Sequence, residues 1–146
     1  MAISVNRVVR TSAAPPAAVL AYLLDFEHAV EWDAGTVSCT RLSGDGGVGT
    51  RYRNVSEFNG RPMELEYTVR AVGDDSFVIV GRAKGVESYD TVSVRPWGQG
   101  GTELTYDARF TLSGVLALAA PFLGRTFDRL ADATAAELQK ALDKLH

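Results

Sequence analysis

The sequence predicts an α+β fold in which a seven-stranded, curved antiparallel sheet wraps around a long C-terminal helix, with short helices after the first strand. Two observations lead to this prediction. Turn signals divide the middle of the chain into segments with two-residue periodicity, whereas the last third has the three-four spacing of an amphipathic helix. A single long helix after a run of strands needs a concave surface to lie on, so the sheet should curve and enclose a hollow.

The first elements are a strand and a short helix. Residues 3–10 alternate between apolar and polar side chains, as expected for a strand. Pro16 suits the first turn of a helix, where a missing N–H leaves no hydrogen bond unmade. Apolar residues follow at helical spacing up to Asp25, so we expect either one short helix or a pair of helices broken near residues 25–28.

Six further strands are expected between residue 36 and the C-terminal helix. Glycine-rich turn signals separate them at Gly44 to Gly47, Asn59-Gly60, Gly73 to Asp75, Lys84-Gly85 and Gly98 to Gly101. These links are too short for parallel crossovers, which need about a dozen residues or more. Neighbouring strands should therefore pair as an antiparallel meander.

Strand alternation predicts which side chains face the hollow. The inward sets are Tyr52, Asn54, Ser56 and Phe58; Met63, Leu65, Tyr67 and Val69; Phe77, Ile79, Gly81 and Ala83; Ser88, Asp90, Val92 and Val94; and Leu104, Tyr106, Ala108, Phe110 and Leu112. The residues that alternate with the last set are expected in solvent: Glu103, Thr105, Asp107, Arg109 and Thr111. A register slip of one residue would reverse every assignment, so the sequence leaves open which way Asp90, Arg53 and Arg82 point.

The C-terminal helix is expected to follow an apolar link over residues 115–123 and to end at Leu145. Its apolar stripe consists of Leu123, Phe127, Leu130, Thr134, Leu138, Ala141 and Leu145. Pro121 falls near the start, either as a first-turn residue or as a kink. The segment around it has three alternative roles: it gates ligand access, touches a membrane surface, or packs against the end of the sheet.

Composition narrows the class of protein. The 146 residues are 46% hydrophobic, so residues 1–146 are expected to form a single domain with a substantial core. The formal net charge is −3 and no Lys/Arg cluster stands out, so nucleic acid is not an expected partner. The first residues contain no apolar signal core and residues 115–123 are about half a membrane span. We therefore expect a cytoplasmic protein without stable membrane insertion.

Several features together carry a resemblance to a known family. They are the Pro-started helix, Asp25-Phe26-Glu27, Trp32, Gly47-Val48-Gly49-Thr50, the strand start from Gly101 to Tyr106, and the closing helix. In this order they resemble the START-like superfamily, also called SRPBCC or Bet v1-like, and within it the bacterial polyketide cyclase/dehydrase and lipid-transport group. The resemblance implies a helix-grip fold around a deep apolar cavity. It also implies that Trp32 either roofs the cavity mouth or anchors a helix on the sheet.

The binding hypothesis follows from this resemblance and from the inward sets. A cavity of roughly several hundred cubic ångströms would hold a small hydrophobic molecule, such as a lipid, a quinone or a polyketide-like compound. Its expected ligand-binding residues are Trp32, Tyr52, Asn54, Met63, Leu65, Ile79, Val92, Phe110, Leu123, Phe127 and Leu130. A homodimer is a further option for the assembly.

The alternative is a polyketide cyclase/dehydrase-type enzyme acting in the same cavity. Such chemistry needs a base and a donor for a developing enolate, and Asp90, Tyr106 and Tyr67 are the candidate catalytic residues. The competing interpretation places Asp90 in a satisfied network with an arginine or a tyrosine. Ring-forming members of the family tend to have a pronounced inward set of Arg, His, Tyr and Trp side chains, and no inward histidine is evident in this sequence.

Metal and cofactor sites are not expected. His28 and His146 are the only histidines and Cys39 is the only cysteine, so a metal site would depend on carboxylates scattered over several strands. The lone cysteine is typical of a small apolar filler. No phosphate-binding loop, dinucleotide fingerprint or nucleophile elbow occurs in the sequence. His28, beside Glu27 and Glu31, is either a group that titrates near neutrality or a solvated residue.

Overall fold

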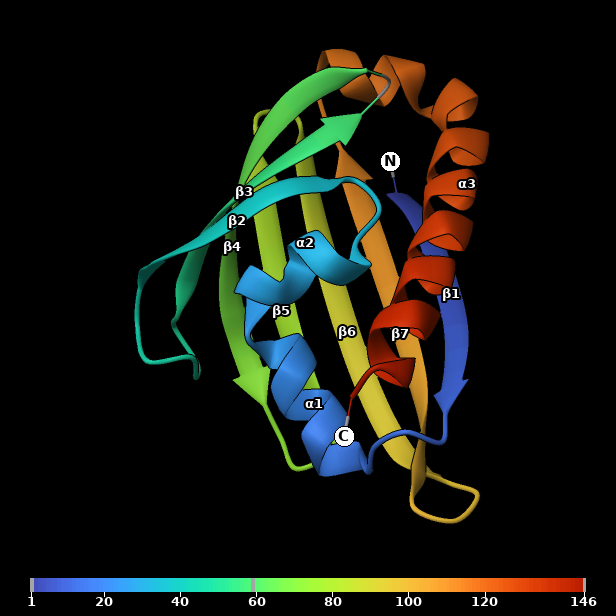
Figure 1. The fold of residues 1–146 in the computed structure, drawn as a ribbon. Helices are drawn as coiled ribbons and strands as arrows, with labels where there is room; N and C mark the ends of the chain where they lie inside the picture. The colour runs from blue at the N-terminus through green and yellow to red at the C-terminus, as the bar shows by residue number, and fades with distance from the viewer. Residues whose placement is uncertain (1, 59, 146) are drawn as a thin grey trace.

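The computed structural model describes residues 2–58 and 60–145 and confirms the predicted helix-grip fold (Figure 1). Its elements, in order, are β1 (Ala2–Thr11), α1 (Pro16–Leu24), the 3-10 turn η1 (Phe26–His28), α2 (Ala29–Trp32), β2 (Thr36–Ser43), β3 (Arg51–Phe58), β4 (Arg61–Val72), β5 (Ser76–Ala83), β6 (Val86–Trp97), β7 (Gly101–Leu112) and α3 (Val115–Asp143). The predicted break in the first helix falls at Asp25, whose side chain accepts a hydrogen bond from the N–H of Glu27.

The strands form one antiparallel sheet in the order β1-β7-β6-β5-β4-β3-β2. From β2 to β7 each strand pairs with the next one in sequence, so the predicted meander is confirmed, and β1 pairs with β7. Register shifts in β2 and between Val69 and Ala71 of β4 interrupt the ladders, and such bulges increase the twist of a sheet. Asn59 of the predicted turn lies outside the described residues.

The concave face of the sheet carries the predicted side chains. Tyr52, Asn54, Leu65, Tyr67, Ile79 and Asp90 are all buried, whereas Glu64, Glu66 and Arg70 are exposed. Arg53 and Arg82 point outward and bind Glu64 and Glu87 at 2.8 and 2.9 Å. The question that the sequence left open is thereby answered, because Asp90 faces inward and both arginines face solvent.

Glu103 corrects one prediction about the outer face. It was expected in solvent, but its side chain is buried between two arginines that lie beside it on the neighbouring strands. Arg10 of β1 and Arg95 of β6 bind its two carboxylate oxygens at 2.8 and 2.5 Å. These hydrogen bonds, led by the one from Arg10, lower the pKa of Glu103.

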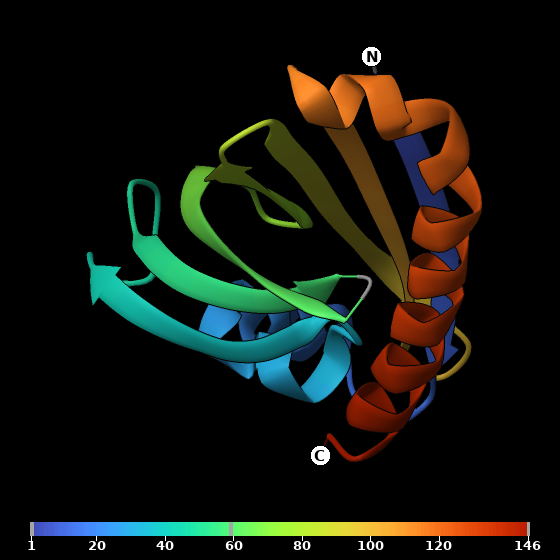
Figure 2. The ribbon, with the colours of Figure 1, turned by 90° about the horizontal axis from the view of Figure 1, so that it is seen from above.

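The long helix also differs from the prediction. The expected apolar link is helical, so α3 begins at Val115 and ends at Asp143 rather than at Leu145. Pro121 therefore lies inside the helix, where a proline lacks the N–H for one hydrogen bond and its ring clashes with the preceding turn. The first turns of α3 run at a clear angle to the rest of the helix (Figures 1 and 2), so the kink interpretation of Pro121 is correct.

The core lies between the concave face and the helices. The main part of α3 packs along β1 at one edge of the sheet (Figure 1). On the same face, α1 contacts β6 and β7, and α2 contacts both α3 and β2. Viewed from above, the sheet begins at β1 behind α3 and curves away from this helix toward β2 (Figure 2). No helix within the described residues is long and apolar enough to cross a membrane.

Candidate functional site

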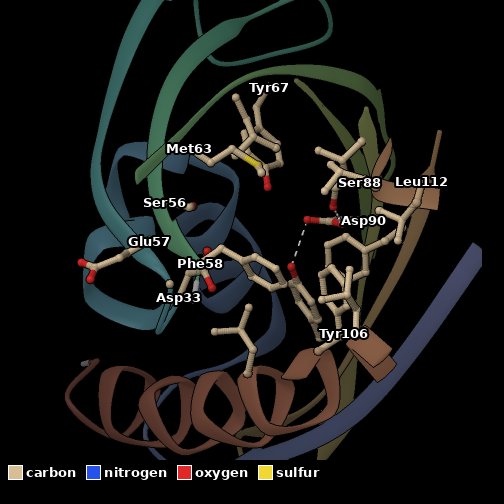
Figure 3. A pocket seen from close by; sticks show the side chains of 18 residues that line it. Asp33, Ser56, Glu57, Phe58, Met63, Tyr67, Ser88, Asp90, Tyr106 and Leu112 are labelled. Carbon is tan, nitrogen blue, oxygen red and sulfur yellow. Dashed lines mark hydrogen bonds between the residues drawn. The ribbon is translucent and has the colours of Figure 1, made fainter. Parts of the chain in front are cut away.

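A cavity of about 100 Å³ lies between α3 and the concave face of the sheet (Figure 3). It is lined by Asp33, Gly35, Ser56, Glu57, Phe58, Met63, Leu65, Tyr67, Val86, Ser88, Asp90, Tyr106, Phe110, Leu112, Leu116, Leu123, Phe127 and Leu130. The prediction of several hundred cubic ångströms was wrong. Aromatic side chains take up much of the hollow, since the Phe127 ring lies 5.1 Å from that of Phe58 and 4.4 Å from that of Phe110.

Asp90 is the central polar group of this cavity. It lies in the middle of β6, where strand alternation turns its side chain inward, and it is 2% exposed. The hydroxyl of Ser88 donates to Oδ1 at 2.5 Å and that of Tyr106 donates to Oδ2 at 2.9 Å. Burial raises the pKa of Asp90 to about 7, although both hydrogen bonds oppose the rise. Asp90 can therefore exchange a proton near neutral pH.

Asp33 is a second carboxyl at the cavity, half-buried, and the sequence did not predict it as a site residue. It follows α2 directly, and the hydroxyls of Thr36 and Thr134 donate to it at 2.6 and 3.2 Å. Burial raises its pKa, against those two hydrogen bonds. The three-residue spacing from Asp33 to Thr36 is a local sign of a polar turn, but the contact with Thr134 of α3 has no signal in the sequence.

Two tyrosines lie on either side of Asp90. The hydroxyl of Tyr67 points into the cavity from β4, opposite Tyr106 on β7 (Figure 3). Burial raises the pKa of both hydroxyls well above the usual value, and the charge of Asp90 adds to the rise. Both tyrosines therefore stay protonated at neutral pH and can serve as hydrogen-bond donors.

The predicted site residues fall into two groups. The cavity lining includes Met63, Leu65, Tyr67, Asp90, Tyr106, Phe110, Leu123, Phe127 and Leu130. Trp32, Tyr52, Asn54, Ile79 and Val92 are buried but lie outside the lining. The roles of both groups in binding or catalysis stay predictions.

Trp32 and Asn54 support the lining from behind. The Trp32 ring makes edge contacts with Phe26 at 5.7 Å and with Tyr106 at 5.8 Å, an arrangement that fits the anchoring interpretation. The side-chain amide of Asn54 donates to Thr36 at 3.1 Å and accepts from Ser56 at 2.6 Å. Both residues thus hold side chains that themselves reach the cavity or Asp33.

His28 lies away from the cavity. Its ring stacks on Tyr22 with the centroids 4.5 Å apart, and its Nδ1 is 2.7 Å from the Tyr22 carbonyl oxygen. In the part of the chain that the structure describes, no three His, Cys, Asp or Glu side chains are grouped to hold a metal ion. His146 lies outside that part.

Gly81 positions the Tyr67 hydroxyl. A Cβ at residue 81 would lie 2.6 Å from two atoms of the Tyr67 ring, which occupies the space above the glycine. We expect Gly81→Ala to displace this ring and to lower the free energy of unfolding by about 1–3 kcal/mol, as overpacking does. Urea denaturation measures the change. Gly124→Ala is the control because open space surrounds that position in α3, and equal losses in both variants would contradict the packing argument.

A family profile described as polyketide cyclase / dehydrase and lipid transport matches residues 3–145. A START superfamily protein from Mycobacterium smegmatis has 17% identity and a TM-score of 0.81, with 98% of this chain and 99% of that chain covered. The Zhui aromatase/cyclase from Streptomyces sp. R1128 has 14% identity and a TM-score of 0.82, with 99% and 95% covered. The search of curated proteins finds no significant match. At these identities the two structures establish the likeness of fold.

Proposed function

The chain belongs to the polyketide cyclase/dehydrase and lipid transport family, and from this membership we propose that it binds a small hydrophobic molecule in the cavity beneath α3. The observation that carries the proposal is the lining of that cavity. Leu, Val, Met and Phe side chains make up most of it. Ser88, Tyr67 and Tyr106 lie around Asp90, and Asp33 and Ser56 lie on the opposite side (Figure 3). Ligand sites commonly combine an apolar wall with a small number of orienting polar groups.

The volume limits the size of the ligand that the cavity can hold. An apolar cavity of about 150 Å³ is known to hold one benzene molecule, so about 100 Å³ suits at most a single small ring. A lipid, quinone or polyketide-like ligand would require the cavity to open. Leu116 and Leu123 cover it from the first turns of α3, on both sides of Pro121. We propose that this kinked segment moves to admit the ligand.

Leu123 and Phe122 provide a matched test of the cavity. Leu123 lines it and is buried, whereas the adjacent Phe122 is 84% exposed. We expect Leu123→Trp to weaken binding of a single-ring probe, benzyl alcohol, by at least about tenfold because the larger ring fills the cavity. Phe122→Trp should leave the affinity unchanged. NMR titration of the labelled protein measures both dissociation constants.

Equal affinity in the two folded variants would overturn the assignment of the cavity as the binding site. Mass spectrometry of small molecules that co-purify with the native protein complements the titration. A retained lipid, quinone or polyketide would identify which of these three ligand classes the protein binds.

A second candidate function is a cyclase or dehydrase reaction in the same cavity. The observation that favours it is the placement of Asp90, whose pKa of about 7 suits a general base, between two protonated tyrosines. Asp90 would take a proton from the carbon next to a carbonyl, and the Tyr67 hydroxyl would donate a hydrogen bond to the enolate oxygen. Turnover of a polyketide-like substrate by the wild type, lost in Asp90→Asn, would support this function. Turnover retained by that variant would exclude Asp90 as the base.

A further inference from the structure

Most side-chain hydrogen-bond donors at the cavity already donate to oxygen atoms of the protein. Ser88 and Tyr106 both donate to Asp90, and Ser56 donates to the amide oxygen of Asn54. Among the described lining residues, Tyr67 is the one whose side-chain hydroxyl does not donate to a carboxylate or amide oxygen. Unused lone pairs remain on the carboxylates and on the hydroxyl oxygens that donate to them. The cavity therefore offers a ligand far more acceptors than donors.

Asp33, the half-buried second carboxyl, adds to this excess of acceptors. Asp33 receives the hydroxyl protons of Thr36 and Thr134 and still has lone pairs free. It borders the main cavity and also a second chamber of about 40 Å³, which lies between α3, β1 and β7. The two chambers share Tyr106, Phe110, Phe127 and Leu130 as further lining residues. A ligand placed in either chamber would thus lie near the carboxyl of Asp33.

The formal charges around the cavity have one sign. The described residues of the main lining include three acids, Asp33, Glu57 and Asp90, and no Lys, Arg or His. Glu57 turns its carboxylate away from the cavity (Figure 3). Arg7 borders only the smaller chamber, where Asp128 and Asp132 bind its guanidinium at 2.6 and 2.9 Å. No opposite charge is therefore available in the main lining to hold an anionic ligand.

We propose that the ligand is a small apolar molecule with a protonated amine, held with its ammonium group at Asp90, and that the cavity rejects carboxylates. The inference rests on the proposed binding function and specifies the ligand chemistry of that site. An ammonium group supplies three donors to a site rich in acceptors, and a carboxylate supplies none. A carboxylate would also add a like charge next to buried acids, which is an effective way to exclude a competitor.

Binding of a protonated amine is expected to change the protonation of Asp90. When Asp90 holds its proton in the free protein, an ammonium ligand favours the ionised form, and one proton leaves to solvent. The charged and titratable groups that face Asp90 are Tyr106 from β7, Tyr67 from β4 and Asp33 from the segment after α2. None of them supplies a competing positive charge. Amine affinity should therefore rise between pH 6 and pH 8, as Asp90 ionises.

Three single-ring probes test the inference: benzylamine, benzyl alcohol and benzoate, titrated by NMR at pH 7.5. They share one ring and differ in the charge and donors of the attached group. We expect benzylamine to bind at least about tenfold more tightly than benzoate, with benzyl alcohol between them. Benzoate binding as tightly as benzylamine would overturn the inference while leaving the binding function intact. Failure of all three to bind would instead overturn the proposed function.

A pair of charge-matched variants separates the cavity from the general negative charge of the protein. Asp90→Asn should reduce the preference for benzylamine over benzyl alcohol to about twofold or less. Asp74→Asn removes an equal charge from the exposed turn between β4 and β5 and should leave the preference unchanged. Equal effects of the two variants would show that the amine senses only the net charge, and the inference would be wrong.

Discussion

Ionisation of Asp90 is expected to lower the unfolding free energy of the wild-type protein by on the order of 4 kcal/mol between about pH 4 and pH 7. Asp90→Asn should lack this pH-dependent decrease. The pKa of Asp90 rises from 3.8 to about 7 on folding, chiefly because the side chain is buried. Between these values the unfolded chain has lost this proton while the folded chain keeps it. Stability therefore falls as the pH rises through this window and is level above it.

Urea denaturation at pH 4, 5.5 and 7.5 measures this effect. The quantity to compare is the unfolding free energy of Asp90→Asn minus that of the wild type. This difference should increase as the pH rises. Asp33 has a raised pKa of the same sign, so part of the slope should persist in the variant. Asp74→Asn, in an exposed turn, should follow the wild-type profile. Parallel profiles of Asp90→Asn and the wild type would show that Asp90 does not titrate abnormally.

Phe127→Ala is expected to lower the free energy of unfolding by about 3–5 kcal/mol. The side chain is 6% exposed, and its ring packs between those of Phe58 and Phe110. Truncation would leave a void beside the existing cavity, because Phe127 borders both chambers. The joined space should then admit larger rings than the wild type does.

Phe122 is the matched control for this prediction. It lies on the same helix, and its side chain is 84% exposed, so Phe122→Ala should change stability by no more than about 0.5 kcal/mol. Chemical denaturation gives both values. A loss below about 1 kcal/mol for Phe127→Ala would mean that the aromatic wall of the cavity is not part of the stable core.

Most of the fold could be predicted from local patterns. The alternation of Leu65 and Tyr67 with Glu64 and Glu66 identifies both the strand and its buried face, since successive side chains of a strand point to opposite sides. The same pattern put Asp90 in a set expected to face inward, but only the strand register of the structure decided that direction. The pattern could not show which inward residues reach a ligand, because this depends on which parts of the concave face α1, α2 and α3 cover (Figure 1).

Ile79 and Val92 illustrate this limit. Both face inward as predicted and both are buried, yet neither lines the cavity. A period of two identifies a face of the sheet and carries no information on how far along the strand that face is covered. The position of the cavity along the strands depends on how α3 lies against β1, which is a contact between the two ends of the chain.

Residue types and their periodicity thus determined the kinds of element, their order, the antiparallel pairing and the buried faces. Contacts between distant residues decided the remainder. Thr134 brings α3 to Asp33, Arg10 and Arg95 together bury Glu103, and three phenylalanines from different elements reduce the cavity to about 100 Å³. The physical reason is range. Backbone geometry acts over a few neighbouring residues, whereas burial, charge pairing and cavity volume arise only when separate elements pack together.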